Sequence, residues 1–75
     1  MSVESVTYDE AKKITLEYYV QRRDGTPLPL RDVPRKIVAN QALSLNAIIA
    51  HIESNTEIGQ WLVGEYIASL GLVLA

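Results

Sequence analysis

Seven cationic side chains are the residues of this chain best suited to binding chemistry, and all of them lie in its first half. They are Lys12, Lys13, Arg22, Arg23, Arg31, Arg35 and Lys36. Because these seven stand against only three acidic residues, residues 12–36 carry a net charge of +4 within a chain whose net charge is −2. A segment with this charge can attract phosphate groups, an anionic lipid surface or the acidic face of a protein.

The cationic segment also contains the best candidates for a contact surface. Arg22 and Arg23 stand beside a predicted turn, and Tyr19 places a large aromatic ring close to them in the sequence. Tyrosine and arginine are enriched among the residues that dominate the binding energy of protein interfaces. We therefore predict that the partner is an acidic protein surface. The residues assigned to its binding are Arg22, Arg23, Tyr19, Arg31, Arg35 and Lys36.

A nucleic acid is the alternative partner that the sequence leaves open. A two-stranded ribbon that carries arginines can enter a DNA groove, and the start of a helix at Pro34 would offer N–H groups to a phosphate. The net charge of −2 argues against this alternative, because nucleic-acid binders usually carry a strong basic excess. A helix-turn-helix over residues 45–67 has the same weakness, since its second helix contains Glu57 and Glu65 but no Lys or Arg.

Catalytic and metal-binding chemistry finds little support in the residue types. His51 is the only histidine, so a catalytic triad lacks a second candidate base, and no serine lies in a Gly-x-Ser-x-Gly setting. The chain contains no cysteine, which excludes disulfides and zinc–thiolate sites. We predict a non-enzymatic protein without a cofactor and without a metal site.

A β-hairpin over residues 13–31 is the element expected to present the cationic residues. Residues 14–21 alternate between apolar and polar and are rich in β-branched and aromatic side chains, which is typical of a strand. Asp24 and Gly25 form a dipeptide that is common in hairpin turns. The return segment, residues 26–31, contains two prolines and is therefore expected to be an edge strand or an extended arm.

The segment before this hairpin is expected to be a loose arm over residues 1–6, followed by the start of a helix. Thr7 and Glu10 have the spacing of a capping box, in which the side chain of each residue caps the backbone N–H of the other. This spacing predicts a short helix over residues 8–12 and leaves open a longer helix that runs to Val20.

Two helices are predicted behind the hairpin. Apolar residues recur at intervals of three or four over residues 32–54, where Asp32 is a good N-cap. Ser44 is an alternative N-cap that would split this helix into two. The second helix is predicted over residues 56–71, with Thr56 as its N-cap. Gly71 suits the position that follows a helix C-terminus.

The second predicted helix is apolar on two sides, which bears on association. One apolar side can pack in the core, and the other is expected to contact a second copy of the chain. Oligomerisation is a common source of stability for a chain of this size. The residues assigned to this homodimer interface are Trp61, Val63, Ile67, Leu70 and Leu74.

These elements predict one small α+β domain over residues 1–75, in which an N-terminal β-hairpin packs on two antiparallel helices. The first residues are acidic and do not resemble a signal peptide. The apolar C-terminal stretch is shorter than the ~20 residues needed to span a bilayer. We therefore expect a cytoplasmic protein that does not enter a membrane and that acts as an adaptor, regulator or inhibitor through protein binding.

Overall fold

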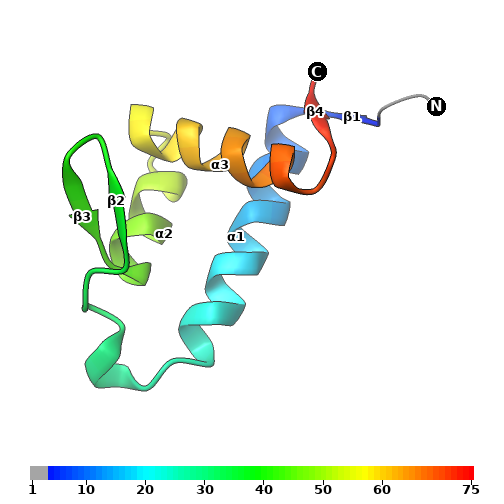
Figure 1. Ribbon diagram of the computed structural model, residues 1–75. Helices are drawn as coiled ribbons and strands as arrows, with labels where there is room; N and C mark the ends of the chain where they lie inside the picture. Colours follow the sequence, from blue (N-terminus) through cyan, green and yellow to red (C-terminus); the bar gives the residue numbers. More distant parts are fainter. Residues whose placement is uncertain (1–3) are drawn as a thin grey trace.

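The computed structural model describes residues 4–75 as a set of helices with two small sheets (Figure 1). In chain order the elements are β1 (Ser5–Val6), α1 (Tyr8–Asp24), the 3₁₀ helix η1 (Leu28–Leu30), β2 (Lys36–Val38), β3 (Gln41–Leu43), α2 (Leu45–Glu53), α3 (Glu57–Ser69) and β4 (Val73–Leu74). The strands β2 and β3 pair antiparallel, whereas β1 and β4 pair parallel. The class is therefore mixed helix and strand, as the sequence predicts. None of the helices in this described part combines the length and the hydropathy that crossing a membrane requires.

The predicted hairpin over residues 13–31 is wrong, because residues 8–24 form the single helix α1. Thr7 is confirmed as the N-cap, because its Oγ1 accepts a hydrogen bond from Glu10 N at 3.2 Å. The second half of the predicted capping box differs: Glu10 Oε1 accepts from the Thr7 hydroxyl, at 3.1 Å, and not from the Thr7 backbone N–H. The buried face of the helix consists of Ala11, Thr15 and Tyr19. Residues four positions apart share one helix face, and their burial overrides the strand preference of the individual residue types.

The Asp24–Gly25 dipeptide ends α1 instead of turning a hairpin. Gly25 has a φ of −81°, and its N–H donates to Gln21 O at 3.0 Å, which closes the last helical turn. The segment with two prolines that follows forms η1 and not an edge strand. Arg22 and Arg23 thus lie in the last turn of α1, where their charge complements the helix dipole.

The observed hairpin is formed by β2 and β3, inside the segment predicted to be a helix. Ala39 and Asn40 connect the two strands and both have positive φ, 50° and 65°, as in the two-residue turns that match the twist of a hairpin. Two consecutive left-handed residues interrupt a right-handed helix. The predicted helix over residues 32–54 is therefore reduced to α2, for which Ser44 is the N-cap and accepts a hydrogen bond from Ala47 N at 3.1 Å.

The helix α3 lies where the sequence predicts the last helix. It begins after Thr56, whose Oγ1 accepts a hydrogen bond from Gly59 N at 3.0 Å. It ends before Gly71, which has a φ of +78°, a conformation that glycine adopts without a steric penalty. After this glycine, the N–H of Val73 donates a hydrogen bond to Glu4 O at 3.1 Å. The last strand therefore lies beside the first (Figure 1).

The core lies between the three α-helices of the described chain. The helix α2 packs against both α1 and α3, and the largest fully buried side chains come from these three helices. They are Ile48, Ile52, Leu62, Ile67, Val63 and Thr15. The two helices α2 and α3 approach each other closely at Gly59, where any side chain would collide with the backbone carbonyl of His51. The hairpin adds Val38 and Leu43 to this core.

Candidate functional site

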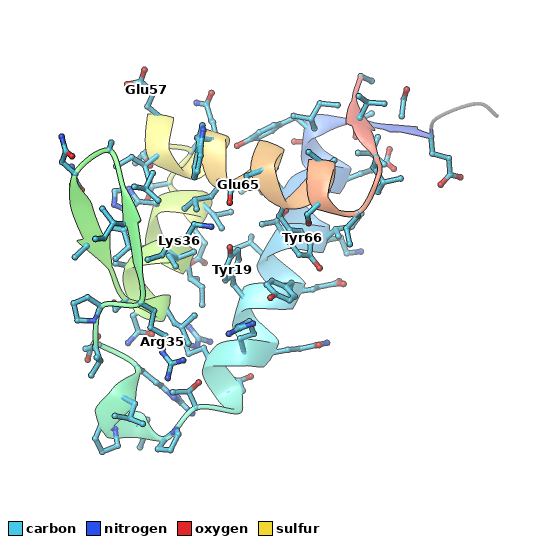
Figure 2. All side chains as sticks on the ribbon, in the orientation of Figure 1. Tyr19, Arg35, Lys36, Glu57, Glu65 and Tyr66 are labelled. Carbon is cyan, nitrogen blue, oxygen red and sulfur yellow. The ribbon has the colours of Figure 1, made fainter. Side chains whose placement is uncertain are left out.

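A cavity of about 200 Å³ lies between α1, the start of β2 and the start of α2, and we call it the basic pocket. It is lined by Tyr18, Tyr19, Arg22, Arg35, Lys36, Leu45 and Ile48. Four of these residues belong to the six that the sequence assigns to partner binding. Figure 2 shows Tyr19 and Lys36 extending from α1 and β2 into the same space, with Arg35 at its edge. The fold thus brings Arg22, from the middle of the cationic segment, together with Arg35 and Lys36 at its end.

Helical spacing holds Arg22 at the edge of the basic pocket. Tyr18 and Arg22 are four residues apart and therefore lie on the same face of α1. Arg22 Nη1 donates a hydrogen bond to Tyr18 Oη at 2.8 Å, and the guanidinium carbon lies 5.5 Å from the centre of the Tyr18 ring. The Tyr18 ring in turn stacks on Tyr66 of α3, with ring centres 4.4 Å apart. These contacts restrain the Arg22 side chain from one side.

Lys36 connects the basic pocket to the surface of α3. Its Nζ forms an ion pair with Glu65 Oε1 at 2.8 Å, and this hydrogen bond raises the pKa of Lys36. The same Nζ lies 5.8 Å from the centre of the Trp61 ring, a distance at which a cation is attracted to an aromatic face. One side chain therefore contacts both the pocket and α3.

Tyr19 lies deeper than the sequence predicts. A strand would place its ring on an exposed polar face, whereas the helix α1 turns it into the core, where only 9% of the residue is exposed. Its ring packs edge-on against Tyr18, with ring centres 5.0 Å apart and an interplanar angle of 76°. Burial raises the pKa of its hydroxyl. Tyr19 therefore contributes a wall of the basic pocket and not a large exposed contact surface.

An alkaline titration is expected to lower the free energy of unfolding through Tyr19 and Lys36. Both groups hold their proton more tightly in the folded chain, because burial raises the pKa of Tyr19 and the hydrogen bond to Glu65 raises that of Lys36. Their stabilisation is complete below the unfolded-state pKa values, which lie near 10, and it is lost as the pH rises through the higher folded-state values. Urea unfolding from about pH 8 to 12 measures this loss, and Tyr19→Phe should remove part of it. A urea midpoint that stays constant over this range would contradict the prediction.

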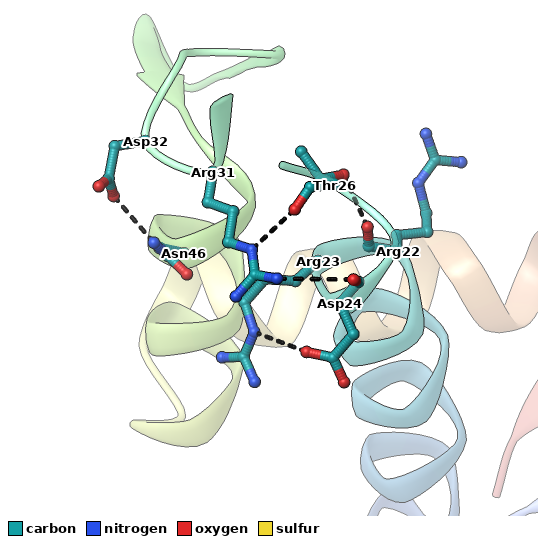
Figure 3. A network of polar contacts seen from close by, with 7 residues as sticks. All are labelled: Arg22, Arg23, Asp24, Thr26, Arg31, Asp32 and Asn46. Carbon is teal, nitrogen blue, oxygen red and sulfur yellow. Dashed lines mark hydrogen bonds and ion pairs between the residues drawn. The ribbon is translucent and has the colours of Figure 1, made fainter. Parts of the chain in front are cut away.

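Arg23 and Arg31 lie outside the basic pocket, in the polar network of the loop after α1 (Figure 3). Arg31 Nε donates a hydrogen bond to Thr26 O at 2.9 Å, and Arg31 Nη2 donates a longer one to Asp24 O at 3.5 Å. Arg23 Nε lies 3.6 Å from Asp24 Oδ1. Arg31 therefore ties the loop after α1 to the end of that helix, whereas Arg23 contacts only the neighbouring residue of α1.

An exposed apolar cavity adjoins the basic pocket, and the sequence does not predict it. Its volume is about 530 Å³, and we call it the apolar groove. It is lined by Ile37, Val38, Ala39, Glu57, Ile58 and Trp61. Ile37 is 76% exposed and Trp61 is 51% exposed. A helix over residues 32–54 would have put Ile37 on its apolar face, whereas the strand β2 leaves this side chain exposed. The sequence signal for the hairpin is Asn40, a residue type that tolerates left-handed turns.

The five residues predicted for a homodimer interface lie in three different places. Val63 and Ile67 are buried in the core of their own chain, so they present no surface to a second copy. Trp61 lines the apolar groove, and Leu70 and Leu74 are partly exposed near the end of the chain. The physical reason is that α3 packs against both α1 and α2, which uses both of its apolar sides within one chain.

His51 takes part in the turn between α2 and α3. Its Nδ1 lies 2.8 Å from the Oγ1 of Thr56, the residue that caps α3. Among residues 4–75, no three side chains of metal-binding types come together in an arrangement that would hold a metal ion.

Comparison of the chain with protein-family models, with curated proteins and with solved structures found no match. Its function is therefore inferred from the basic pocket and the apolar groove themselves.

Proposed function

We propose that this chain is a non-enzymatic protein-interaction module that binds an acidic partner protein across the basic pocket and the apolar groove. The observation that carries the proposal is the position of Lys36, which lines the pocket while its Nζ lies 5.8 Å from the ring of Trp61 in the groove. A cationic surface and an apolar surface therefore adjoin, and one partner can contact both.

The side chains around these two cavities are of the types that bind proteins. Large apolar residues that remain exposed around a concave surface mark interaction sites, and Ile37 and Trp61 are both more than half exposed. Tryptophan, tyrosine and arginine contribute most of the binding energy at many interfaces. The cationic groups of the pocket would steer an acidic partner and fix its orientation.

A nucleic-acid partner has less support. Arg31 is engaged in the loop after α1, Arg23 lies beside Asp24, and Lys36 pairs with Glu65. These contacts leave a short cationic surface around the basic pocket, whereas binding to a phosphate backbone depends on many cationic contacts along its length.

Self-association remains part of the proposal, through a smaller surface than the sequence suggested. Leu70, Val73 and Leu74 are each at least 40% exposed, and they lie where β4 follows α3. A second copy that covered these side chains would add buried apolar area to a chain whose own core is small. The proposed homodimer therefore forms near β4 and leaves the partner-binding face open.

A photo-cross-linking amino acid at position 37 tests the partner-binding face. Ile37 is exposed and lines the apolar groove, so a docked partner should be cross-linked in an extract of the source cells. The matched control carries the same amino acid at position 13. Lys13 is exposed and lies about two and a half turns of α1 before Arg22, on the opposite helix face. We expect a cross-linked protein from position 37 only, and its loss when Arg35→Gln is added.

Nuclease treatment and sedimentation complete this experiment. A cross-linked product that survives nuclease treatment supports a protein partner. A cross-linked product that disappears would show that the partner is a nucleic acid. Equal products from positions 37 and 13 would overturn the docking face. Sedimentation as a monomer at micromolar concentration would remove the homodimer and leave the partner-binding face standing.

A further inference from the structure

Within residues 4–75, the positive charge of the basic pocket is balanced only in part. Of its three cationic side chains, Lys36 forms an ion pair with Glu65 at 2.8 Å. Among residues 4–75, neither Arg22 nor Arg35 has a carboxylate partner. Three cations and one carboxylate leave a net charge of +2 at this place. A ligand that neutralises it must carry about two negative charges.

The same residues supply hydrogen-bond donors from several directions. Arg22 is restrained by its bond from Nη1 to Tyr18 Oη, which leaves other N–H groups of its guanidinium for a ligand. Arg35 adds a second guanidinium from the other side of the pocket, and Tyr19 adds a hydroxyl. Because burial raises the pKa of Tyr19, this hydroxyl stays protonated at neutral pH and acts as a donor.

The inner wall of the basic pocket is apolar. It is formed by Leu45 and Ile48, which are 3% and 2% exposed. Behind this wall lies the core and not water, so the local dielectric constant is lower than in bulk solvent. Hydrogen bonds between charged groups are stronger in such surroundings than on an open surface.

We infer that the basic pocket binds a phosphate monoester. This group carries about −1.5 to −2 charges at pH 7 and presents three strong acceptor oxygens, which fit the charge and the donors of Arg22, Arg35 and Tyr19. A carboxylate or a phosphodiester carries a single charge and would leave the pocket about one positive charge in excess. The inference rests on the proposed function and deepens it, since the acidic group of the partner is then a phosphorylated side chain.

Two small probes of the same size class test this inference. Methyl phosphate is a monoester and dimethyl phosphate is a diester, so they differ by one charge and one acceptor oxygen. Each is titrated into the full chain at constant ionic strength, while NMR follows the Nε–H signals of Arg22 and Arg35. Methyl phosphate is expected to saturate the pocket and to bind about tenfold more tightly, because one charge-assisted hydrogen bond contributes a factor of this order. Equal affinities for the two probes would overturn the inference.

Three matched variants locate the binding site. Arg22→Gln and Arg35→Gln are each expected to weaken methyl phosphate binding about tenfold. Arg23→Gln is the control, since Arg23 neighbours Arg22 on α1 but its guanidinium lies against Asp24 in the loop network. It should leave the affinity unchanged, and circular dichroism confirms that all three variants are folded. If Arg23→Gln lowered the affinity for methyl phosphate as much as the other two variants, the loss would follow from the overall charge of the protein. That result would overturn the assignment of the site.

Two peptides separate a phosphorylated partner from a free phosphate compound. A phosphoserine peptide that binds more tightly than methyl phosphate, while its serine counterpart does not bind, supports a phosphorylated protein. A phosphopeptide that binds no more tightly than methyl phosphate supports the same pocket with a small phosphate compound as its ligand. If methyl phosphate shows no preference over the diester while Arg35→Gln still abolishes cross-linking from position 37, the phosphate inference fails and the proposed function stands. If methyl phosphate binds selectively but no cross-link forms, the pocket stands and the partner-binding function fails.

Discussion

Replacing Gly59 with alanine is expected to lower the free energy of unfolding by about 3 kcal/mol. A methyl group at this position of α3 would collide with the backbone carbonyl of His51 and press on the backbone of Ile52, both in α2. Backbone atoms inside a helix cannot rotate away, so the two helices would have to separate. A chain of 75 residues has a total stability of roughly 4 to 11 kcal/mol, and this loss is therefore a large share of it. Urea unfolding followed by circular dichroism measures the change.

Gly64→Ala is the matched control on the same helix. A methyl group there has Leu74 Cδ1 as its nearest neighbour outside the helix, at 3.9 Å, which is an ordinary van der Waals distance. Alanine is more favourable than glycine inside a helix by about 1 kcal/mol, so this variant should be as stable as the natural chain or more stable. Equal behaviour of the two variants would show that the contact at Gly59 does not limit the packing of α2 on α3.

Replacing Ile52 with alanine is expected to cost about 3 to 4 kcal/mol of stability. Ile52 is completely buried in α2, the helix that packs against both α1 and α3. Truncation removes buried methyl groups and leaves a cavity that rigid neighbours fill only in part. A fall in the urea midpoint without a change in its slope would show that the folded state lost stability while the unfolded state stayed the same.

Ile37→Ala makes the same chemical change at an exposed position. Ile37 is 76% exposed in β2, so its truncation is expected to change stability by less than about 1 kcal/mol. The same variant should weaken cross-linking of the partner when the probe is placed elsewhere in the apolar groove. A large loss of stability from Ile37→Ala would mean that this side chain serves the fold, and it would weaken the argument for a binding surface.

Helix ends are the part of this fold that the sequence predicts best. Thr7, Thr56 and Gly71 each act on backbone groups within a few positions along the chain, so their effect does not depend on distant contacts. The mixed helix and strand class is also right, although the observed strands lie in other segments than the predicted ones. The assignment of particular segments to strand or helix does not follow from such local signals.

Thr15 illustrates why the sequence favoured a strand over the longer helix that the Thr7 and Glu10 spacing left open. In a strand, this polar residue would lie on the polar face together with Glu17 and Tyr19. In α1 it is fully buried, and its hydroxyl donates a hydrogen bond to Ala11 O at 2.7 Å, an acceptor that lies within reach only in a helix. The helix is therefore selected by packing against α2 and α3, which no local pattern reports.

The residue types of the basic pocket were predictable, but their geometry was not. Arg22 and Arg35 reach the same cavity only because the loop after α1 returns the chain to β2. Arg31 belongs to the same cationic segment and has the same chemistry, yet the carbonyl of Thr26 holds it in that loop. Which arginine faces a ligand is thus decided by the path of the backbone, and this path emerges only when the helices pack.

The parallel pairing of β1 with β4 has a consequence for the order of folding. It joins Ser5 to Val73, so the loop it closes contains roughly 70 residues, with an entropic cost on the order of 4 kcal/mol if it formed first. Two short strands cannot offset that cost alone. The helices must pack before these strands meet, and the amide of Val73 therefore reports whether the rest of the chain has finished folding. In a refolding experiment with pulsed hydrogen exchange, protection of this amide is expected to appear after that of the helix amides.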